Sequence, residues 1–201
     1  MEWLPVVRYW IAVMLAITLP PAILYWFIIH PFIGFWRRRG LRTTFVFLAV
    51  FYLGFMAALL PVREALLGRD LGTSVPLIAV AVPLLVASGV ISRKRSRHLR
   101  FRTLAGVPEL APEEHGIGLL QEGIYARIRH PRYLEFILGL TGWSLFANYA
   151  GLYVFSAVSI VLLLIIVVLE ERELRQRYGS VYDDYAARVP RFIPRLGGGP
   201  G

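Results

Sequence analysis

The 201-residue sequence contains no cysteine. This absence excludes disulfides, iron–sulfur clusters, thiolate nucleophiles and zinc sites built on cysteine. Histidine is also sparse, and the four residues, at positions 30, 98, 115 and 130, show no metal-ligand spacing. No metal site is therefore expected.

Charged residues are the second scarcity. They make up 17% of the chain against 57% hydrophobic residues, whereas a soluble domain has roughly a quarter charged. Acids are the rarer sign, with 13 Asp and Glu against 22 Lys and Arg, for a net charge of +9. A basic and apolar chain is more typical of a negatively charged membrane surface than of nucleic acid. We therefore expect a membrane protein with no nucleic-acid partner.

Five apolar runs are candidates for membrane crossing, at residues 4–29, 43–62, 74–91, 134–147 and 150–169. A bilayer core needs about 20 helical residues, so the fourth run is short. Only Asn148 and Tyr149 separate the last two runs, which favours an antiparallel helical hairpin. The predicted fold is an all-α membrane protein with about five transmembrane helices, a cytoplasmic loop and an amphipathic C-terminal segment.

The basic residues indicate an orientation. Nineteen of the 22 follow the first, third and fifth runs, so the positive-inside rule places the N-terminus outside and the C-terminus in the cytoplasm, in an expected bacterial inner membrane. The basic stretch after residue 92 is expected to bind anionic lipids. The predicted division is 1–92 for three N-terminal helices, 93–194 for a functional core, and 195–201 for a flexible tail.

His130-Pro131 is the most suggestive dipeptide of the cytoplasmic loop. Proline is favoured at the first position of a helix, and a helix N-terminus beside Arg129 and His130 suits a carboxylate or phosphate. The alternative is an ordinary helix start in the headgroup layer, with Tyr125 and Tyr133 as interfacial aromatics. Spacing alone leaves both interpretations open.

Glu135 heads a stripe of residues on the following helix. Glu135, Gly139, Gly142 and Phe146 follow a 4, 3, 4 spacing and share one face. An acid and two glycines on one face permit close approach of a bound ligand or of a neighbouring helix, and helix packing is the more common explanation.

Glu170 stands out among the acids after the last run. Glu171 has Arg175 four residues on, the favourable order for an ion pair on a helix, but Glu170 has Leu174 at that distance. A carboxylate without such a partner at the membrane boundary is a functional candidate, and the alternative is a solvated interfacial acid.

Apolar and aromatic residues recur at near-helical intervals beyond Glu170, interrupted by Gly179: Leu174, Tyr178, Tyr182, Tyr185 and Val189. They predict an amphipathic element that lies against the membrane face or covers the cytoplasmic mouth of a site.

Two stretches together resemble the integral-membrane methyltransferase family that includes isoprenylcysteine carboxyl methyltransferases and phospholipid N-methyltransferases. The first is Gly123-Ile124-Tyr125 followed by Arg129-His130-Pro131-Arg132-Tyr133. The second is Glu170-Glu171, followed by the C-terminal tyrosines and by Val189-Pro190-Arg191-Phe192-Ile193-Pro194. The resemblance implies methyl transfer from S-adenosylmethionine to a lipophilic or small acceptor at the cytoplasmic membrane face.

By position, the resemblance implies a set of cofactor-binding residues: Ile117, Gly118, Leu119, Leu120, Tyr125, His130, Pro131, Arg132, Tyr133 and Glu170. A carboxylate such as Glu170 accepts hydrogen bonds from the cofactor's ammonium group or ribose hydroxyls. For an amine acceptor, Glu135 or Glu170 is the candidate catalytic base.

Two departures from the family pattern bear on the acceptor. Ile166 stands where isoprenylcysteine methyltransferases carry an arginine associated with the acceptor carboxylate, and Glu135 stands where glycine is frequent. Both disfavour a carboxylate acceptor and favour an amine, a thiol or another neutral lipid-like molecule. The alternative function is a non-enzymatic membrane protein, either a small transporter or an assembly factor. Because the ionisable residues fall at the boundary of the membrane and not at its middle, we favour the enzyme.

Overall fold

The computed structural model describes residues 3–29, 32–97 and 118–194. Within these ranges the regular secondary structure is helical, apart from one isolated β-bridge between Asp70 and Tyr149. The all-α prediction is therefore confirmed. The elements are α1 (Trp3–Ile29), α2 (Ile33–Arg39), α3 (Leu41–Leu59), η2 (Leu60–Val62), α4 (Arg63–Leu67), α5 (Val75–Ser96), η3 (Gly123–Ala126), α9 (Pro131–Ala147), α10 (Ala150–Tyr178) and α11 (Ser180–Arg188).

Four helical stretches of the described chain are long and apolar enough to cross a membrane. They are Trp3–Ile29, Leu41–Leu67, Val75–Ser96 and Ala150–Tyr178, and they coincide with four of the five apolar runs. The remaining run forms α9, which has 17 residues and is shorter than the others. The chain thus has the character of an integral membrane protein, and a fifth crossing by α9 stays a prediction.

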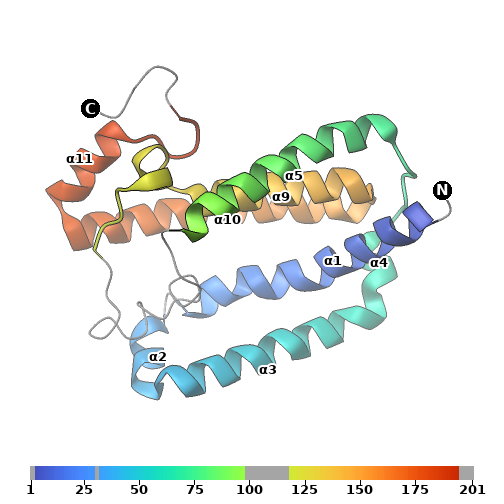
Figure 1. Cartoon of the computed structure of the whole chain (residues 1–201). Helices are drawn as coiled ribbons and strands as arrows, with labels where there is room; N and C mark the ends of the chain where they lie inside the picture. The colour runs from blue at the N-terminus through green and yellow to red at the C-terminus, as the bar shows by residue number, and fades with distance from the viewer. Residues whose placement is uncertain (1–2, 30–31, 98–117, 195–201) are drawn as a thin grey trace.

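The helices form one elongated bundle. Figure 1 shows α1 running between α3 on one side and the group of α5, α9 and α10 on the other. Asn148, in the left-handed conformation at φ 57°, and Tyr149 connect α9 to α10. η3 and α11 lie at one end of the bundle, and the N-terminal end of α1 lies at the other.

The glycines of the predicted stripe on α9 face α5. A Cβ placed on Gly142 would lie 2.8 Å from the Cγ of Leu85, and one on Gly139 would lie 3.0 Å from the Oγ of Ser88. Ser88 also donates a hydrogen bond of 2.9 Å to the carbonyl oxygen of Glu135. Small residues let helix backbones approach closely in a membrane, so this stripe serves helix packing.

A buried arginine fixes the N-terminal end of the bundle. Arg8 of α1 is 1% exposed, and its Nη2 lies 2.6 Å from the Oδ1 of Asp70. It also donates hydrogen bonds to Thr73 and to the carbonyl oxygen of Ala147, the last residue of α9. One guanidinium therefore joins α1, the loop before α5 and the end of α9 at the end of the molecule away from α11.

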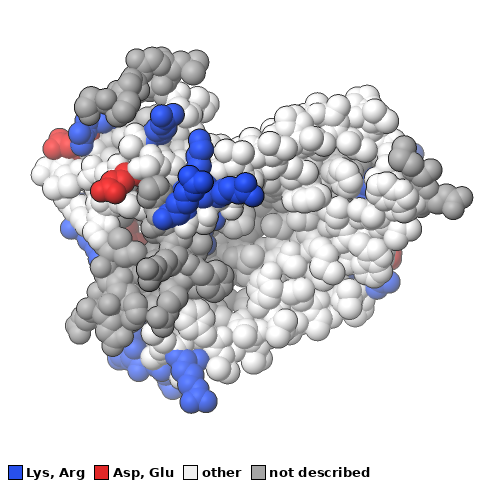
Figure 2. Space-filling model, in the orientation of Figure 1, with Lys and Arg blue, Asp and Glu red and all other residues white. Residues whose placement is uncertain are grey.

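Charge is unevenly distributed over the surface. Figure 2 shows most of the visible Lys and Arg near α2, α11 and the C-terminal end of α5, while the middle of the molecule is free of charge on this face. Arg93, Lys94 and Arg97 at the end of α5 are exposed. Arg95 is buried and is directed inward. Arg100 and Arg102 of the same predicted stretch lie outside the described residues.

Candidate active site

Glu171 on α10 is the centre of a buried ionic cluster. Its side chain is 1% exposed, and Arg129 Nη2 lies 2.7 Å from its Oε1. Arg191 donates to both carboxylate oxygens, at 3.0 and 2.7 Å, and His130 Nε2 donates to Oε1 at 3.1 Å. The predicted partner Arg175 is the most distant cation, at 4.0 Å. A carboxylate with this many donors is ionised.

This cluster shows which carboxylate the side chains at the start of α9 bind within the protein. Pro131 occupies the first turn of the helix, as predicted, and His130 precedes it. The side chains of Arg129 and His130 both bind a carboxylate, but that carboxylate is Glu171 of the same chain. The basic residues before α9 therefore hold α10 in place.

The segment that follows α11 lies across the start of α9. The backbone N–H groups of Arg129 and His130 donate to the carbonyl oxygens of Pro190 and Arg191, at 2.9 and 3.1 Å. The ring of Phe192 lies 6.2 Å from that of His130, and Phe192 packs with Tyr133. The hydrogen bond from the Arg191 guanidinium to Glu171 raises the pKa of that arginine. The segment thus covers the N-terminal end of α9.

The predicted amphipathic tail forms a small core of its own. Gly179, at φ 54°, ends α10 and lets α11 turn back. Tyr182, Tyr185 and Val189 are buried together and pack against Leu119 of the loop. Burial raises the pKa of Tyr182 to about 12. The apolar face of α11 is therefore used inside the protein.

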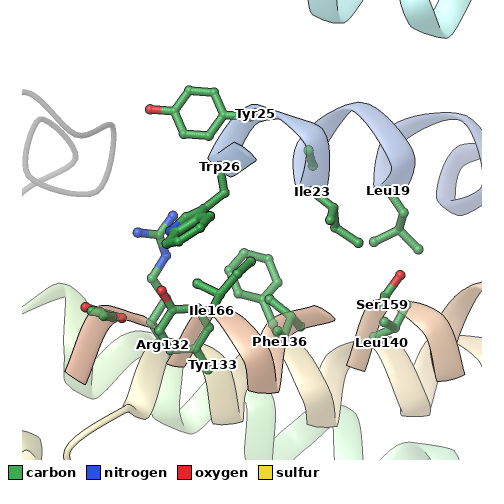
Figure 3. A pocket seen from close by; sticks show the side chains of 13 residues that line it. Leu19, Ile23, Tyr25, Trp26, Arg132, Tyr133, Phe136, Leu140, Ser159 and Ile166 are labelled. Carbon is green, nitrogen blue, oxygen red and sulfur yellow. The ribbon is translucent and has the colours of Figure 1, made fainter. Parts of the chain in front are cut away.

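A cavity of about 150 Å³ opens beside this cluster, between α1, α9 and α10 (Figure 3). Its lining is largely apolar, with Arg132 and Glu170 as its charged members and Ser159 as a buried hydroxyl. The lining residues are Leu19, Ala22, Ile23, Tyr25, Trp26, Arg132, Tyr133, Phe136, Leu140, Ser159, Leu163, Ile166 and Glu170.

Glu170 is the carboxylate that lines the cavity. Its side chain is 36% exposed, yet its Oε2 is buried and has no hydrogen-bond partner within the described residues. The Nδ1 of His130 lies 3.8 Å from this oxygen, beyond hydrogen-bond distance. A buried carboxylate oxygen without a donor is costly, so this atom is suited to receive a donor from a bound molecule.

Glu135 has a different environment. Its two carboxylate oxygens accept hydrogen bonds from Arg95 of α5, at 2.8 and 3.3 Å, and it does not line the cavity. Such a paired geometry ties α9 to α5. The structure therefore does not bring the two predicted catalytic acids together.

Tyr125 on η3 lies close to both sets of charges. Burial raises its pKa to about 12, and the charges of Arg95, Glu170, Arg132 and Glu135 also act on it. Its carbonyl oxygen accepts a hydrogen bond of 2.7 Å from the hydroxyl group of Tyr185. The segment that carries Tyr125 is thus joined to α11.

The nine predicted cofactor residues that the structure describes divide into three groups. Arg132, Tyr133 and Glu170 line the cavity, and Tyr125, His130 and Pro131 lie around its charged end. Leu119 packs under the C-terminal tyrosines, Leu120 is half-buried and Gly118 is exposed. Ile117 lies outside the described residues.

Two features of this site were missing from the sequence prediction. Helical spacing pairs Glu171 only with Arg175, whereas its closer partners, Arg129 and Arg191, lie in the two motif stretches, and these two arginines are a usable signal for a shared acid. The wall contributed by α1 had no such signal, because Leu19, Ile23 and Trp26 belong to an apolar run with no distinct pocket face.

Comparison with known proteins places these residues in a wider context. The family model described as phospholipid methyltransferase matches residues 77–181, slightly more than half of the chain. Methanethiol S-methyltransferase 2 of Bradyrhizobium diazoefficiens is 37% identical over 73 residues, which cover 36% of this chain and 27% of that protein. Protein-S-isoprenylcysteine O-methyltransferase B of Arabidopsis thaliana is 30% identical over 111 residues, covering 55% of this chain and 56% of that protein.

These similarities are partial. The chain spans between a quarter and somewhat more than half of the length of these two relatives. Another relative, the nickel-cobalt-cadmium resistance protein NccN of Alcaligenes xylosoxydans xylosoxydans, is 33% identical over 78 residues, 39% of this chain and 37% of that protein. No solved structure gives a significant match.

Proposed function

Because the chain belongs to the phospholipid methyltransferase family, we propose that it is an integral-membrane methyltransferase that uses S-adenosylmethionine. The observation that carries the proposal is the carboxylate of Glu170, which lines the cavity and has a buried oxygen with no donor in the described chain. The ammonium group and ribose hydroxyls of the cofactor are donors of the required kind.

The cavity and the cofactor site are proposed to be neighbours. A cavity of about 150 Å³ is too small for a nucleoside joined to an amino acid, so it suits the acceptor. The cofactor would lie at the charged end, where Tyr125, His130 and Arg132 surround Glu170. The loop residues Ile117, Gly118, Leu119 and Leu120, together with Pro131 and Tyr133, complete the proposed cofactor set.

The chemistry then depends mainly on position. The bound cofactor supplies an electrophilic methyl group on a sulfonium. Glu170 accepts hydrogen bonds from the cofactor and so orients it. The same carboxylate takes the proton that the methyl acceptor loses. The apolar lining of the cavity excludes water. Arg129, His130 and Glu171 hold the ends of α9 and α10 at a fixed separation, so that Glu170 stays at the cavity. Because Glu135 is bound to Arg95, we propose Glu170 as the base in preference to Glu135.

The acceptor is proposed to be a small neutral thiol. One relative is named for S-methylation of methanethiol and another for O-methylation of protein isoprenylcysteine. Ile166, in place of the arginine associated with an acceptor carboxylate, lines the cavity of this chain. Arg132 and Glu170 contribute opposite charges at one end, so the cavity has no surplus cation to hold a carboxylate.

We also propose a membrane arrangement. α9 would form a fifth span in an antiparallel hairpin with α10, with the N-terminus outside and the C-terminus in the cytoplasm of a bacterial inner membrane. Residues 1–92 and 93–194 would be an N-terminal helical part and a methyltransferase core, with 195–201 as a tail. The exposed Arg93, Lys94 and Arg97 would contact anionic lipids.

Calorimetric titration of S-adenosylmethionine into the detergent-solubilised protein tests the proposal. The wild type should bind, Glu170→Gln should bind at least about tenfold more weakly, and Glu173→Gln, which changes an exposed acid on the same helix, should bind as the wild type does. Failure of the wild type to bind would contradict the proposed function and favour a non-enzymatic membrane protein. Normal binding by Glu170→Gln would overturn only the role given to Glu170.

A further inference from the structure

The cavity beside Glu170 has walls of two origins. Those from α9 and α10 lie within the family-matched residues 77–181, and they supply both charged groups, Arg132 and Glu170. The opposite wall comes from α1, which lies outside that match. Figure 3 shows Leu19 and Ile23 pointing from α1 toward Leu140 and Ser159 across the cavity.

The cavity changes character along its length. Arg132 and Leu140 both line it and are eight residues apart on α9, which corresponds to about 12 Å along a helix. The far end is formed by Leu19, Leu140 and Ser159, and the last two are 6% and 3% exposed. An ionic group carried to that end would lose its hydration without gaining a counter-ion. The far end therefore accepts only uncharged, largely apolar groups.

The volume limits how much of a molecule is enclosed. An engineered apolar cavity of roughly 150 Å³ in another protein binds benzene, a molecule of six carbon atoms. The cavity here, also about 150 Å³, accommodates a chain of similar size beyond the reacting atom. Adding a methylene group to a filled apolar pocket typically changes discrimination by about tenfold or more.

We infer that α1 is the specificity wall of the acceptor site and that the acceptor is a short alkyl thiol of up to roughly six carbon atoms. The chain lies against Leu19 and Ile23, and its sulfur faces Glu170. The thiol proton goes to the Glu170 carboxylate, a bond forms between the thiol sulfur and the methyl carbon, and the bond from that carbon to the sulfonium breaks, leaving its electron pair on the cofactor's sulfur. The inference rests on the proposed function and adds the size limit and the residues that set it.

The test is a chain-length series. Straight-chain thiols from ethanethiol to dodecanethiol are offered at equal mole fraction in detergent micelles, and kcat/KM for methylation is measured for each. The wild type should lose at least about tenfold in kcat/KM beyond hexanethiol. Leu19→Ala, which lengthens the far end, should shift the limit to longer thiols, and Ile23→Phe, which fills the middle, should shift it to shorter ones. Leu24→Ala is the matched control, because Leu24 is exposed on α1 and does not line the cavity.

Binding of S-adenosylmethionine is measured for each variant, so that failure of the inference is distinguished from failure of the proposed function. The inference is supported if every variant binds the cofactor normally and the chain-length limit becomes longer in Leu19→Ala and shorter in Ile23→Phe. Normal cofactor binding with equal rates for all thiols, or with a length limit that does not change in the Leu19 and Ile23 variants, overturns the inference and leaves the proposed function in place. Normal cofactor binding with no thiol methylated overturns the inference and the proposed thiol acceptor, and leaves only the proposed use of S-adenosylmethionine. Loss of cofactor binding in the wild type overturns the proposed function itself.

Discussion

Glu170 and Glu171 are adjacent on α10 but occupy opposite environments. Glu171 is 1% exposed and is bound by Arg129, His130 and Arg191, whereas Glu170 has a 36% exposed side chain that lines the cavity. Successive residues on an α-helix point about 100° apart, so one acid faces the ionic cluster and the other faces the cavity. The first acid holds the helices and the second remains available to a ligand.

Replacing Glu171 should destabilise the protein. Glu171→Gln leaves the buried guanidinium of Arg129 without its counter-ion, and breaking such a pair costs about 3 kcal/mol of unfolding free energy. Thermal unfolding in detergent measures the loss. Glu173→Gln, at an exposed position two residues on, should change stability by less than about 0.5 kcal/mol. Equal stability of the two variants would show that the cluster does not hold the site together.

Gly142 is expected to tolerate no side chain. Gly142→Ala places a methyl group within 2.8 Å of Leu85 and 3.2 Å of the carbonyl oxygen of Ala81, so α5 and α9 must separate at a cost of about 1–3 kcal/mol. Gly89→Ala is the matched control on α5, because nothing lies within 4 Å of its added Cβ. It should leave the unfolding temperature unchanged or raise it slightly. A neutral Gly142→Ala would contradict the close packing of these helices.

The Arg8–Asp70 pair should respond unequally to removal of each partner. Asp70→Ala leaves a guanidinium that is 1% exposed without its carboxylate, while Arg8→Met leaves a carboxylate whose side chain is 45% exposed and can be hydrated. We expect Asp70→Ala to lower the unfolding temperature more than Arg8→Met does. Thermal unfolding followed by near-ultraviolet circular dichroism gives the two unfolding temperatures. A lower unfolding temperature for Arg8→Met than for Asp70→Ala would contradict the buried ion pair as the cause.

The phenol of Tyr125 makes stability depend on alkaline pH. Its pKa is raised by burial to about 12, from an ordinary value of 10.0, so the folded state holds this proton after the unfolded state has released it. The stabilisation is complete below pH 10 and is lost as the pH rises from about 10 to about 12. Unfolding measured across this range should show a shallower decline for Tyr125→Phe than for the wild type. Identical slopes would mean that Tyr125 is solvated in the folded protein.

The helical character and the main elements were predictable from the sequence because long apolar runs have few alternatives in a membrane. Four of the five runs became helices of spanning length, and His130-Pro131 begins α9 as its residue types favour. The function of Gly139 and Gly142 in packing was the more common of two stated alternatives, and it is the one the structure shows. The number of crossings does not follow from run length alone, because α9 has 17 residues and a bilayer core needs about 20.

The partners of the charged residues were less predictable. Local spacing suggested Arg175 for Glu171, but its principal partners come from the loop before α9 and from the tail after α11. Glu135 is bound by Arg95 of α5, which is 40 residues earlier in the sequence. Periodicity describes contacts within one helix, whereas these ion pairs depend on which helices pack together. For the same reason no pattern in α1 revealed that Leu19 and Ile23 line a cavity.

The most direct measurement is transfer of a labelled methyl group by the purified protein. The protein in detergent is incubated with methyl-labelled S-adenosylmethionine and butanethiol, and the volatile thioether is collected and counted. We expect labelled butyl methyl sulfide from the wild type and from Glu173→Gln, and at least about a hundredfold less from Glu170→Gln, since this residue is proposed to act both on the cofactor and on the thiol proton. Equal production of the labelled thioether by Glu170→Gln and by the wild type would contradict the central role of Glu170.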